Sequence, residues 1–332
     1  MRKARIDCAK LTGRDEAHEY LGVALSDWDY RGHNLDALYD VLTSLPGEIV
    51  LSGAAQAEVY AQKVLRTLRD AAARSDGLSL TEETGVRIGV GVYIVREAAR
   101  QNLAGTLRRL AETGYEGAEL LGFFGAAPGA LRVMLEEAHI EALGDHMPVE
   151  VFLKDPDRAV EEHLAVGCRR LTLACAKERI ASEPFDALAR DFENAAKICL
   201  GAGIAPLYHI HDFDMSGDEP FAARMLDAVG LLRFEPDVGW MAVAGQDPAR
   251  FIEKYRARIP VVHLKDVALK DGGFAFRPTG YGGVNIPALL PGILAARPEW
   301  LVVDHDLAYG RDAYRDLALS CEYVKTLLSI SP

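Results

Sequence analysis

The chain has 332 residues, of which 49% are hydrophobic and 26% charged, and this composition is globular rather than disordered or fibrous. Its net charge of -12 disfavours nucleic acid, whose phosphates would be repelled, and suits a basic protein or a metal ion as partner. No apolar run approaches the roughly 20 residues of a membrane span, and no signal-peptide pattern follows the N-terminus. Five cysteines without a C-x-x-C pair predict reduced thiols and a cytoplasmic protein.

The first 84 residues predict a small α/β module. We expect strands at residues 4–8, 49–51 and 78–80, and helices at residues 16–24, 35–42 and 57–73. Only residues 81–85 separate this module from the next pattern, so the predicted domains are residues 1–84 and 85–332.

The helix expected at residues 35–42 has two different faces. Asn34 can cap its N-terminus, and three leucines at helical spacing can enter a core. Asp36 and Asp40 are four residues apart and share another face, with Tyr39 beside them. Two carboxylates at this spacing repel each other, which indicates either a surface for a cation or an ordinary solvated helix face.

The run YRGHNLDALYD at residues 30–40 resembles the barstar family, the intracellular inhibitors of a secreted ribonuclease. The resemblance covers residues 2 to about 82 and implies a three-stranded α/β fold whose acidic face binds a basic ribonuclease. By position it implies that Tyr30, Asp36, Tyr39, Asp40 and Asp70 contact the partner. Two of these depart from the family, which has tryptophan at position 39 and glutamate at position 70.

From residue 86 onward, short apolar runs alternate with amphipathic stretches. The runs lie at residues 87–94, 117–121, 141–144, 170–174, 205–209, 232–234, 261–264 and 300–303. Eight strand–helix units in about 245 residues predict a (β/α)8 TIM barrel. An open doubly wound sheet would show the same alternation, but no G-x-G-x-x-G follows the first strand.

Histidines and carboxylates occur together at the ends of five expected strands, where a barrel places its chemistry. They lie in the runs Asp145–His146, Tyr208–Asp214, Glu235–Trp240, His263–Asp266 and Asp304–Asp306. Imidazole and carboxylate without clustered thiolates suit Mn²⁺, Co²⁺, Zn²⁺ or Fe²⁺. Such an ion polarises a carbonyl while a nearby side chain moves a proton. Taken singly, each residue is equally well explained as a satisfied polar group at a strand end.

The runs YHIHDF (208–213), DVGW (237–240) and HLKD (263–266) resemble those of the sugar phosphate isomerase/epimerase family, the xylose isomerase-like barrels. The match covers roughly residues 86–328. It implies a divalent-metal-dependent isomerase or epimerase that acts on a sugar, polyol or keto-sugar, and a related lyase would use the same site.

The resemblance also implies roles for single residues. Metal ligands by position are His209, Asp237, His263 and Asp304, with His211 as the alternative to His209. The implied catalytic residues are His209, His211, Lys265 and Asp304, and the implied substrate contacts are His146, Trp240 and Lys265, although Trp240 fits a core position equally well.

Three positions depart from the family pattern. His209 and Asp304 stand where the family has glutamate, and Gly280-Tyr281-Gly282 replaces a Gly-Glu-Gly loop. A second hypothesis therefore stays open, in which the chain is a binding protein. Its acidic N-terminal face would recognise a basic ribonuclease, and its barrel would be degenerate.

Overall fold

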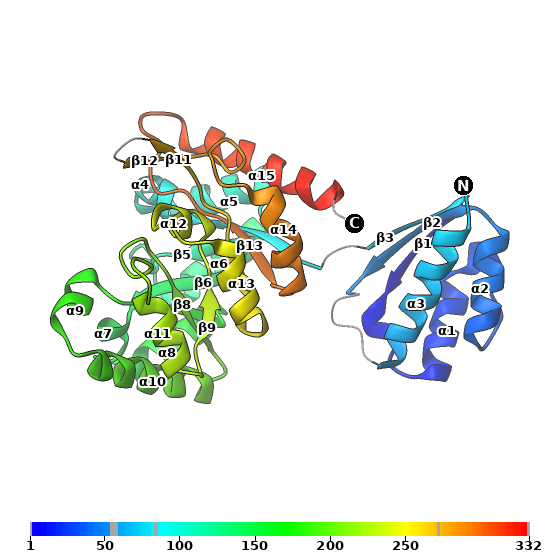
Figure 1. Cartoon of the computed structure of the whole chain (residues 1–332), viewed down its shortest axis with the longest axis horizontal. Helices are drawn as coiled ribbons and strands as arrows, with labels where there is room; N and C mark the ends of the chain where they lie inside the picture. Colours follow the sequence, from blue (N-terminus) through cyan, green and yellow to red (C-terminus); the bar gives the residue numbers. More distant parts are fainter. Residues whose placement is uncertain (1, 54–58, 83–84, 271–272, 331–332) are drawn as a thin grey trace. The chain divides into compact units, whose positions relative to one another are not determined.

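The computed structural model describes residues 2–53, 59–82, 85–270 and 273–330. They form two compact units, one within residues 1–86 and one within residues 87–329 (Figure 1). The domain boundary expected between residues 84 and 85 stays a proposal, because residues 83–84 lie outside the described part of the chain.

The N-terminal unit contains a three-stranded parallel sheet in the order β1-β2-β3. Its elements are β1 (Arg2–Asp7), η1 (Cys8–Lys10), α1 (Arg14–Ala24), η2 (Ser26–Trp28), α2 (Leu35–Ser44), β2 (Gly47–Ser52), α3 (Val59–Arg74) and β3 (Leu78–Glu82). The three-stranded α/β module expected from the sequence is confirmed. The helix expected from residue 57 is described only from Val59, because residues 54–58 lie outside the described part.

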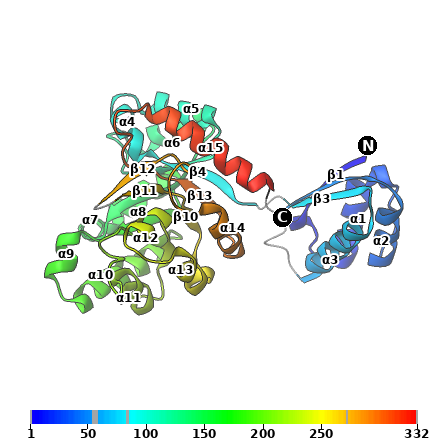
Figure 2. The same cartoon turned by 45° about the horizontal axis from the view of Figure 1, so that its top comes forward.

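Burial alternates along β1 and β2, so one face of this sheet is packed and the other is more open. The three helices lie together along the sheet (Figure 2). In α2, Asn34 Oδ1 accepts a hydrogen bond from the Ala37 N–H at 2.8 Å and caps the helix as expected. Leu38 and Leu42 of the same helix are fully buried in the core of this unit.

The second unit is an eight-stranded parallel sheet in the order β10-β13-β4-β5-β6-β7-β8-β9. A parallel bridge between Asp237 and His263 links its two edges and nearly closes the barrel. The strands are β4 (Arg87–Gly91), β5 (Gly117–Leu120), β6 (Glu141–Pro148), β7 (Arg170–Ala174), β8 (Ala205–His209), β9 (Arg233–Glu235), β10 (Val261–His263) and β13 (Trp300–Val303). The (β/α)8 architecture expected from the alternation is confirmed.

Helices cover the outside of this barrel (Figure 1). They are α4 (Arg96–Gln101), α5 (Leu103–Thr113), α6 (Pro128–Ala138), α7 (Val149–Phe152), α8 (Pro156–Val166), α9 (Lys177–Ser182), α10 (Phe185–Gly201), α11 (Phe221–Ala228), α12 (Val238–Val243), α13 (Pro248–Tyr255), α14 (Ile286–Ala295) and α15 (Ala313–Ile330). Short 3-10 turns lie at η4 (Val92–Val95) and η5 (Arg256–Arg258). No described helix is long and apolar enough to cross a membrane. The five cysteines, all among the described residues, are buried and form no disulfide bond.

Three features of the barrel differ from the expected strands. The first strand ends at Gly91, and residues 92–95 turn into η4 instead of extending to Ile94. Strand β6 runs four residues beyond the expected end, to Pro148. An antiparallel hairpin, β11 (Asp266–Lys270) and β12 (Gly273–Arg277), follows β10 and was not predicted, because its start overlaps the polar run at the strand end.

Candidate active site at the carboxyl ends of the barrel strands

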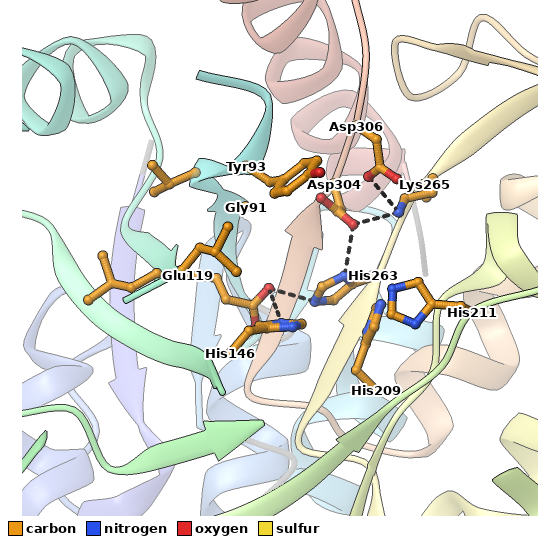
Figure 3. A pocket seen from close by; sticks show the side chains of 13 residues that line it. Gly91, Tyr93, Glu119, His146, His209, His211, His263, Lys265, Asp304 and Asp306 are labelled. Atoms are coloured by element: carbon orange, nitrogen blue, oxygen red, sulfur yellow. Dashed lines mark hydrogen bonds and ion pairs between the residues drawn. The ribbon is translucent and has the colours of Figure 1, made fainter. Parts of the chain in front are cut away.

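A pocket of about 350 Å³ opens at the carboxyl ends of the barrel strands. Its polar lining includes Glu119 on β5, His146 on β6, His209 on β8, His263 on β10 and Asp304 directly after β13 (Figure 3). The strands of a barrel converge at this end, so side chains far apart in the sequence meet here.

Glu235 on β9 lies at the centre of three imidazoles. Its Oε1 is 3.1 Å from His209 Nδ1, 3.3 Å from His146 Nε2 and 3.3 Å from His263 Nε2. The other oxygen, Oε2, accepts a hydrogen bond from the Thr172 hydroxyl at 2.9 Å, which turns Oε1 toward the imidazoles. We call His146, His209, Glu235 and His263 the lower group.

Glu119 lies beside the lower group. Its Oε2 is 2.9 Å from His263 Nε2 and 3.1 Å from His146 Nε2 (Figure 3). Glu119 is 4% exposed and Glu235 is fully buried, so two carboxylates and three imidazoles share one desolvated site. Buried charge of this density is costly unless protons or a cation neutralise it.

A second cluster surrounds Lys265, whose side chain is fully enclosed. Its Nζ is 2.8 Å from Asp304 Oδ2, 2.9 Å from Asp306 Oδ1 and 3.2 Å from Asp237 Oδ2. The ammonium also lies 4.6 Å from the ring centre of Trp240. Asp237, Asp304, His209 and His263 form a set that we call the upper group, and Lys265 contacts both of its carboxylates.

These contacts shift the pKa values of the site residues in different directions. Burial alone would lower the pKa of His146, but the negative charges of Glu119 and Glu235 beside it raise it to about 10. For His209 burial prevails and lowers the pKa to about 4. Burial likewise lowers the pKa of His211 well below its usual value. At neutral pH in the absence of a metal ion, His146 therefore carries a proton while His209 and His211 are neutral.

The residues present fit a divalent metal ion. His146 Nε2, His209 Nδ1, Glu235 Oε1 and His263 Nε2 are buried, and none of them has a hydrogen-bond partner of acceptable geometry among the described residues. The lower and the upper group each bring four ligand atoms within 4.8 Å of one another, and they share His209 and His263. Imidazole and carboxylate donors of this kind suit Zn²⁺, Mn²⁺, Co²⁺ or Fe²⁺.

The structure brings the residues nominated from the sequence to one place. The four positions expected to hold the metal form the upper group, and His146, His211, Lys265 and Trp240 lie beside it. Their individual roles stay predictions. Trp240 is 8% exposed and packs with Val267 and Phe276, so it lies in a small core, which is the alternative that the sequence left open for it.

Glu119 and Glu235 were given no role from the sequence. Glu119 fell inside the strand expected at residues 117–121, and Glu235 began the polar run 235–240, in which Asp237 matched the ligand position of the family. Both lie inside strands whose neighbouring residues are buried. A signal was present for Glu235, which is two residues before Asp237, since residues two apart in a strand point to the same side.

In the N-terminal unit the expected partner-contacting residues divide into two kinds. Asp36, Asp40 and Asp70 are exposed and Tyr39 is half-buried. Tyr30 differs from the other four, because it is 2% exposed, and its contact with a partner stays a prediction. Its hydroxyl lies 2.6 Å from His18 Nδ1 and donates to the Asn34 carbonyl at 3.2 Å, so it supports the start of α2 from within the core.

Residues 1–90 match the family model of barstar, the barnase inhibitor. The barrel resembles a sugar phosphate isomerase/epimerase from Parabacteroides distasonis ATCC 8503, with a TM-score of 0.59, 19% identity and coverage of 73% of this chain and 94% of the other. The chain is therefore similar to barstar over its first 90 residues, and its second unit has the fold of the xylose isomerase-like barrels.

Two further proteins resemble this barrel. The zinc-containing structure of the IOLI protein has a TM-score of 0.60 and 12% identity, and the match covers 74% of this chain and 98% of that one. Inosose dehydratase from Geobacillus kaustophilus (strain HTA426) is 25% identical over 189 residues, which are 48% of this chain. The match spans 61% of that relative's length.

Proposed function

We propose that the barrel is a divalent-metal-dependent isomerase or epimerase of a sugar, polyol or keto-sugar. The observation that carries this proposal is the convergence of buried imidazole and carboxylate atoms that lack hydrogen-bond partners within the described chain. The pocket volume of about 350 Å³ lies near the lower end of the range for small-molecule sites, about 300–1,000 Å³, and so suits a small substrate.

A bound divalent ion would polarise a substrate carbonyl and its neighbouring hydroxyl, which lowers the barrier to removal of the proton between them. The chain's own residues supply the proton transfers. His211 lines the pocket and is neutral at pH 7, so its imidazole can accept that proton. Lys265 also lines the pocket. Its three N–H groups face three carboxylates, so it would act on a substrate oxygen through its positive charge.

Isomerases, epimerases and dehydratases can share this first step, the removal of a proton beside a carbonyl. They differ in whether the carbanion equivalent is reprotonated or expels a hydroxide. The similarity to inosose dehydratase supports a lyase as a variant of the same proposal.

Incubation of the zinc- or manganese-loaded chain with keto-sugars and keto-inositols in D₂O tests the proposal by NMR. An isomerase or epimerase should introduce deuterium beside the carbonyl, and a dehydratase should yield an unsaturated product. A chelator and His211→Gln should each reduce the rate strongly. Neither deuterium incorporation nor product from any of these substrates, with metal bound, would contradict the proposal.

A second candidate function belongs to the N-terminal module, and it is binding of a basic ribonuclease. Asp36 and Asp40 on α2 and Asp70 on α3 are exposed, and the barstar match covers all three. Opposite charges steer such associations, so the affinity should fall as salt is added.

Titration of the full chain with a barnase-type ribonuclease tests this second function. Asp36→Asn with Asp40→Asn should weaken a salt-sensitive complex, whereas the matched control Asp15→Asn on α1 should not. If no complex forms at low salt, ribonuclease binding is excluded.

A further inference from the structure

We propose that this chain holds its divalent ion on the lower group, His146, His209, Glu235 and His263, instead of the upper group that its resemblance nominates. The ion would then lie on β6, β8, β9 and β10, below Lys265 and its three carboxylates. This inference rests on the proposed function for the presence of an ion, and it adds which atoms bind it.

The spacing of the lower group matches a metal site. Glu235 Oε1 is 3.1–3.3 Å from the three facing nitrogens. Metal–ligand bonds of about 2.0–2.2 Å in a tetrahedron place ligand atoms about 3.3–3.6 Å apart, close to these separations. All four atoms are buried and lack hydrogen-bond partners among the described residues, as expected for atoms whose partner is an ion. Asp237 Oδ2 of the upper group also lacks a hydrogen bond, but it faces the Lys265 ammonium at 3.2 Å.

His263 belongs to both groups, and the contacts of its two ring nitrogens indicate in which group it would bind an ion. Its Nδ1 is 3.3 Å from Asp304 Oδ2, so the Nδ1–H has a carboxylate acceptor. In that tautomer Nε2 carries the lone pair, and it faces Glu119 Oε2 at 2.9 Å and Glu235 Oε1 at 3.3 Å, on the side of the lower group. Histidines that bind metals commonly donate their second N–H to a carboxylate in this way, which assigns Asp304 to the outer shell.

A cation already occupies the upper group. Lys265 Nζ contacts Asp304 Oδ2 and Asp237 Oδ2, the two oxygens that an ion there would need. The ammonium is 1% exposed and lies against the rings of Trp240 and Phe276, so the packing holds it in place. An ion in the upper group would face this ammonium at short range, and like charges in a desolvated site repel strongly.

The carboxylates on β9 and directly after it are bound differently. Thr172 orients Glu235 with one oxygen toward the imidazoles. Asp237 uses Oδ1 to accept hydrogen bonds from the Gly239 and Trp240 N–H groups at 2.9 Å, which caps α12. Glu235 therefore has the geometry of a metal ligand, whereas Asp237 caps α12 with Oδ1 and contacts Lys265 with Oδ2.

X-ray absorption on the zinc-loaded full chain tests the assignment without any substitution. The lower group predicts three imidazoles and at least one carboxylate oxygen around the ion, whereas the upper group predicts two imidazoles and two carboxylates. His146→Gln should reduce the count from three imidazoles to two, and it should leave the count unchanged if the upper group binds.

Glu235→Gln and Asp237→Asn form a matched pair two residues apart. Glutamine can keep the hydrogen bond from Thr172, and asparagine can keep the cap of α12. Glu235→Gln should raise the Kd for Zn²⁺ more than about 100-fold, beyond the loss of an outer-shell partner. Asp237→Asn should leave the Kd within about threefold. Circular dichroism confirms that each variant is folded.

The outcomes separate this inference from the proposed function. Two imidazoles around the ion, with binding lost in Asp237→Asn and kept in Glu235→Gln, would overturn the lower-group assignment and leave the function standing. A chain that takes up no stoichiometric Zn²⁺, Mn²⁺ or Co²⁺ overturns both. Zinc on three imidazoles with no turnover of sugars would overturn the function alone.

Discussion

Replacement of Lys265 by methionine should destabilise the barrel by about 3–5 kcal/mol. The ammonium lies 2.8–3.2 Å from three carboxylates and is 1% exposed. At an effective dielectric constant of about 20, each contact near 3 Å contributes about 5 kcal/mol of attraction, and desolvation of the charges offsets most of the sum. Removal of one partner leaves buried carboxylates unpaired, which costs about 3–5 kcal/mol.

Urea unfolding in the presence of a chelator measures this effect without a contribution from bound metal. A Trp28→Phe background removes the tryptophan of the N-terminal unit, so that the fluorescence of Trp240 and Trp300 reports on the barrel. The control is Lys254→Met, which removes an exposed ion pair to Asp227 of 2.8 Å. Exposed pairs contribute less than about 1 kcal/mol, so this variant should differ little from the parent.

The loss in Lys265→Met should depend on pH in a known direction. Burial alone would raise the pKa of Asp304, but Lys265 and His263 outweigh it and hold the pKa well below its usual value. A group of this kind stabilises the fold above the unfolded pKa and loses that contribution as pH falls. The variant should therefore lose more stability at pH 8 than at pH 4. A loss below about 1 kcal/mol at both pH values would refute the tight contact of Lys265 with these carboxylates.

Three further predictions follow from other contacts. Burial lowers the pKa of His18, so the unfolded chain takes up a proton near pH 6.5 before the native N-terminal unit does. The free energy of unfolding of this unit should therefore fall from pH 7.5 to 5.5. In His18→Gln, unfolding followed by Trp28 fluorescence should show a weaker dependence of this free energy on pH. Gly282→Ala should cost about 1–3 kcal/mol in urea unfolding, because its Cβ would meet the Asp266 carboxylate. In the control Gly283→Ala the Cβ would only reach van der Waals contact with the Val267 carbonyl oxygen, at 3.4 Å. Removal of Zn²⁺ by a chelator should lower the barrel's Tm, and zinc at 100 times its Kd should restore about 2.7 kcal/mol. An unchanged Tm would contradict a zinc site that exists only in the folded barrel.

The two-unit architecture was predictable because it depends on local patterns. Apolar runs of strand length recurred eight times with helical stretches between them, and the barrel follows from that alternation. The cap at Asn34 was likewise readable from residue type and position. The hairpin β11–β12 was missed, because its first residue belongs to the HLKD run that indicated a catalytic strand end.

The site was predictable in part, for a physical reason. Residues that end parallel strands of a barrel must come together, so His209 and His263 were placed correctly beside each other. Glu235 was part of the polar run after the sixth expected strand, but Asp237 took the ligand role by its position in the family motif. The packing of Lys265 between carboxylates from different strands depends on distances that spacing along the chain does not encode. The burial of Tyr30 was not predictable from its position, because it depends on a buried partner of its hydroxyl, His18, twelve positions earlier.

The measurement that tests the metal-bound barrel most directly is an anomalous difference map from crystals of the full chain soaked in zinc. We expect one strong peak about 2.1 Å from His146 Nε2, His209 Nδ1, His263 Nε2 and Glu235 Oε1, with Lys265 still paired to Asp237 and Asp304. A peak between Asp237 and Asp304 with Lys265 displaced would contradict it, as would a map without a peak in the pocket.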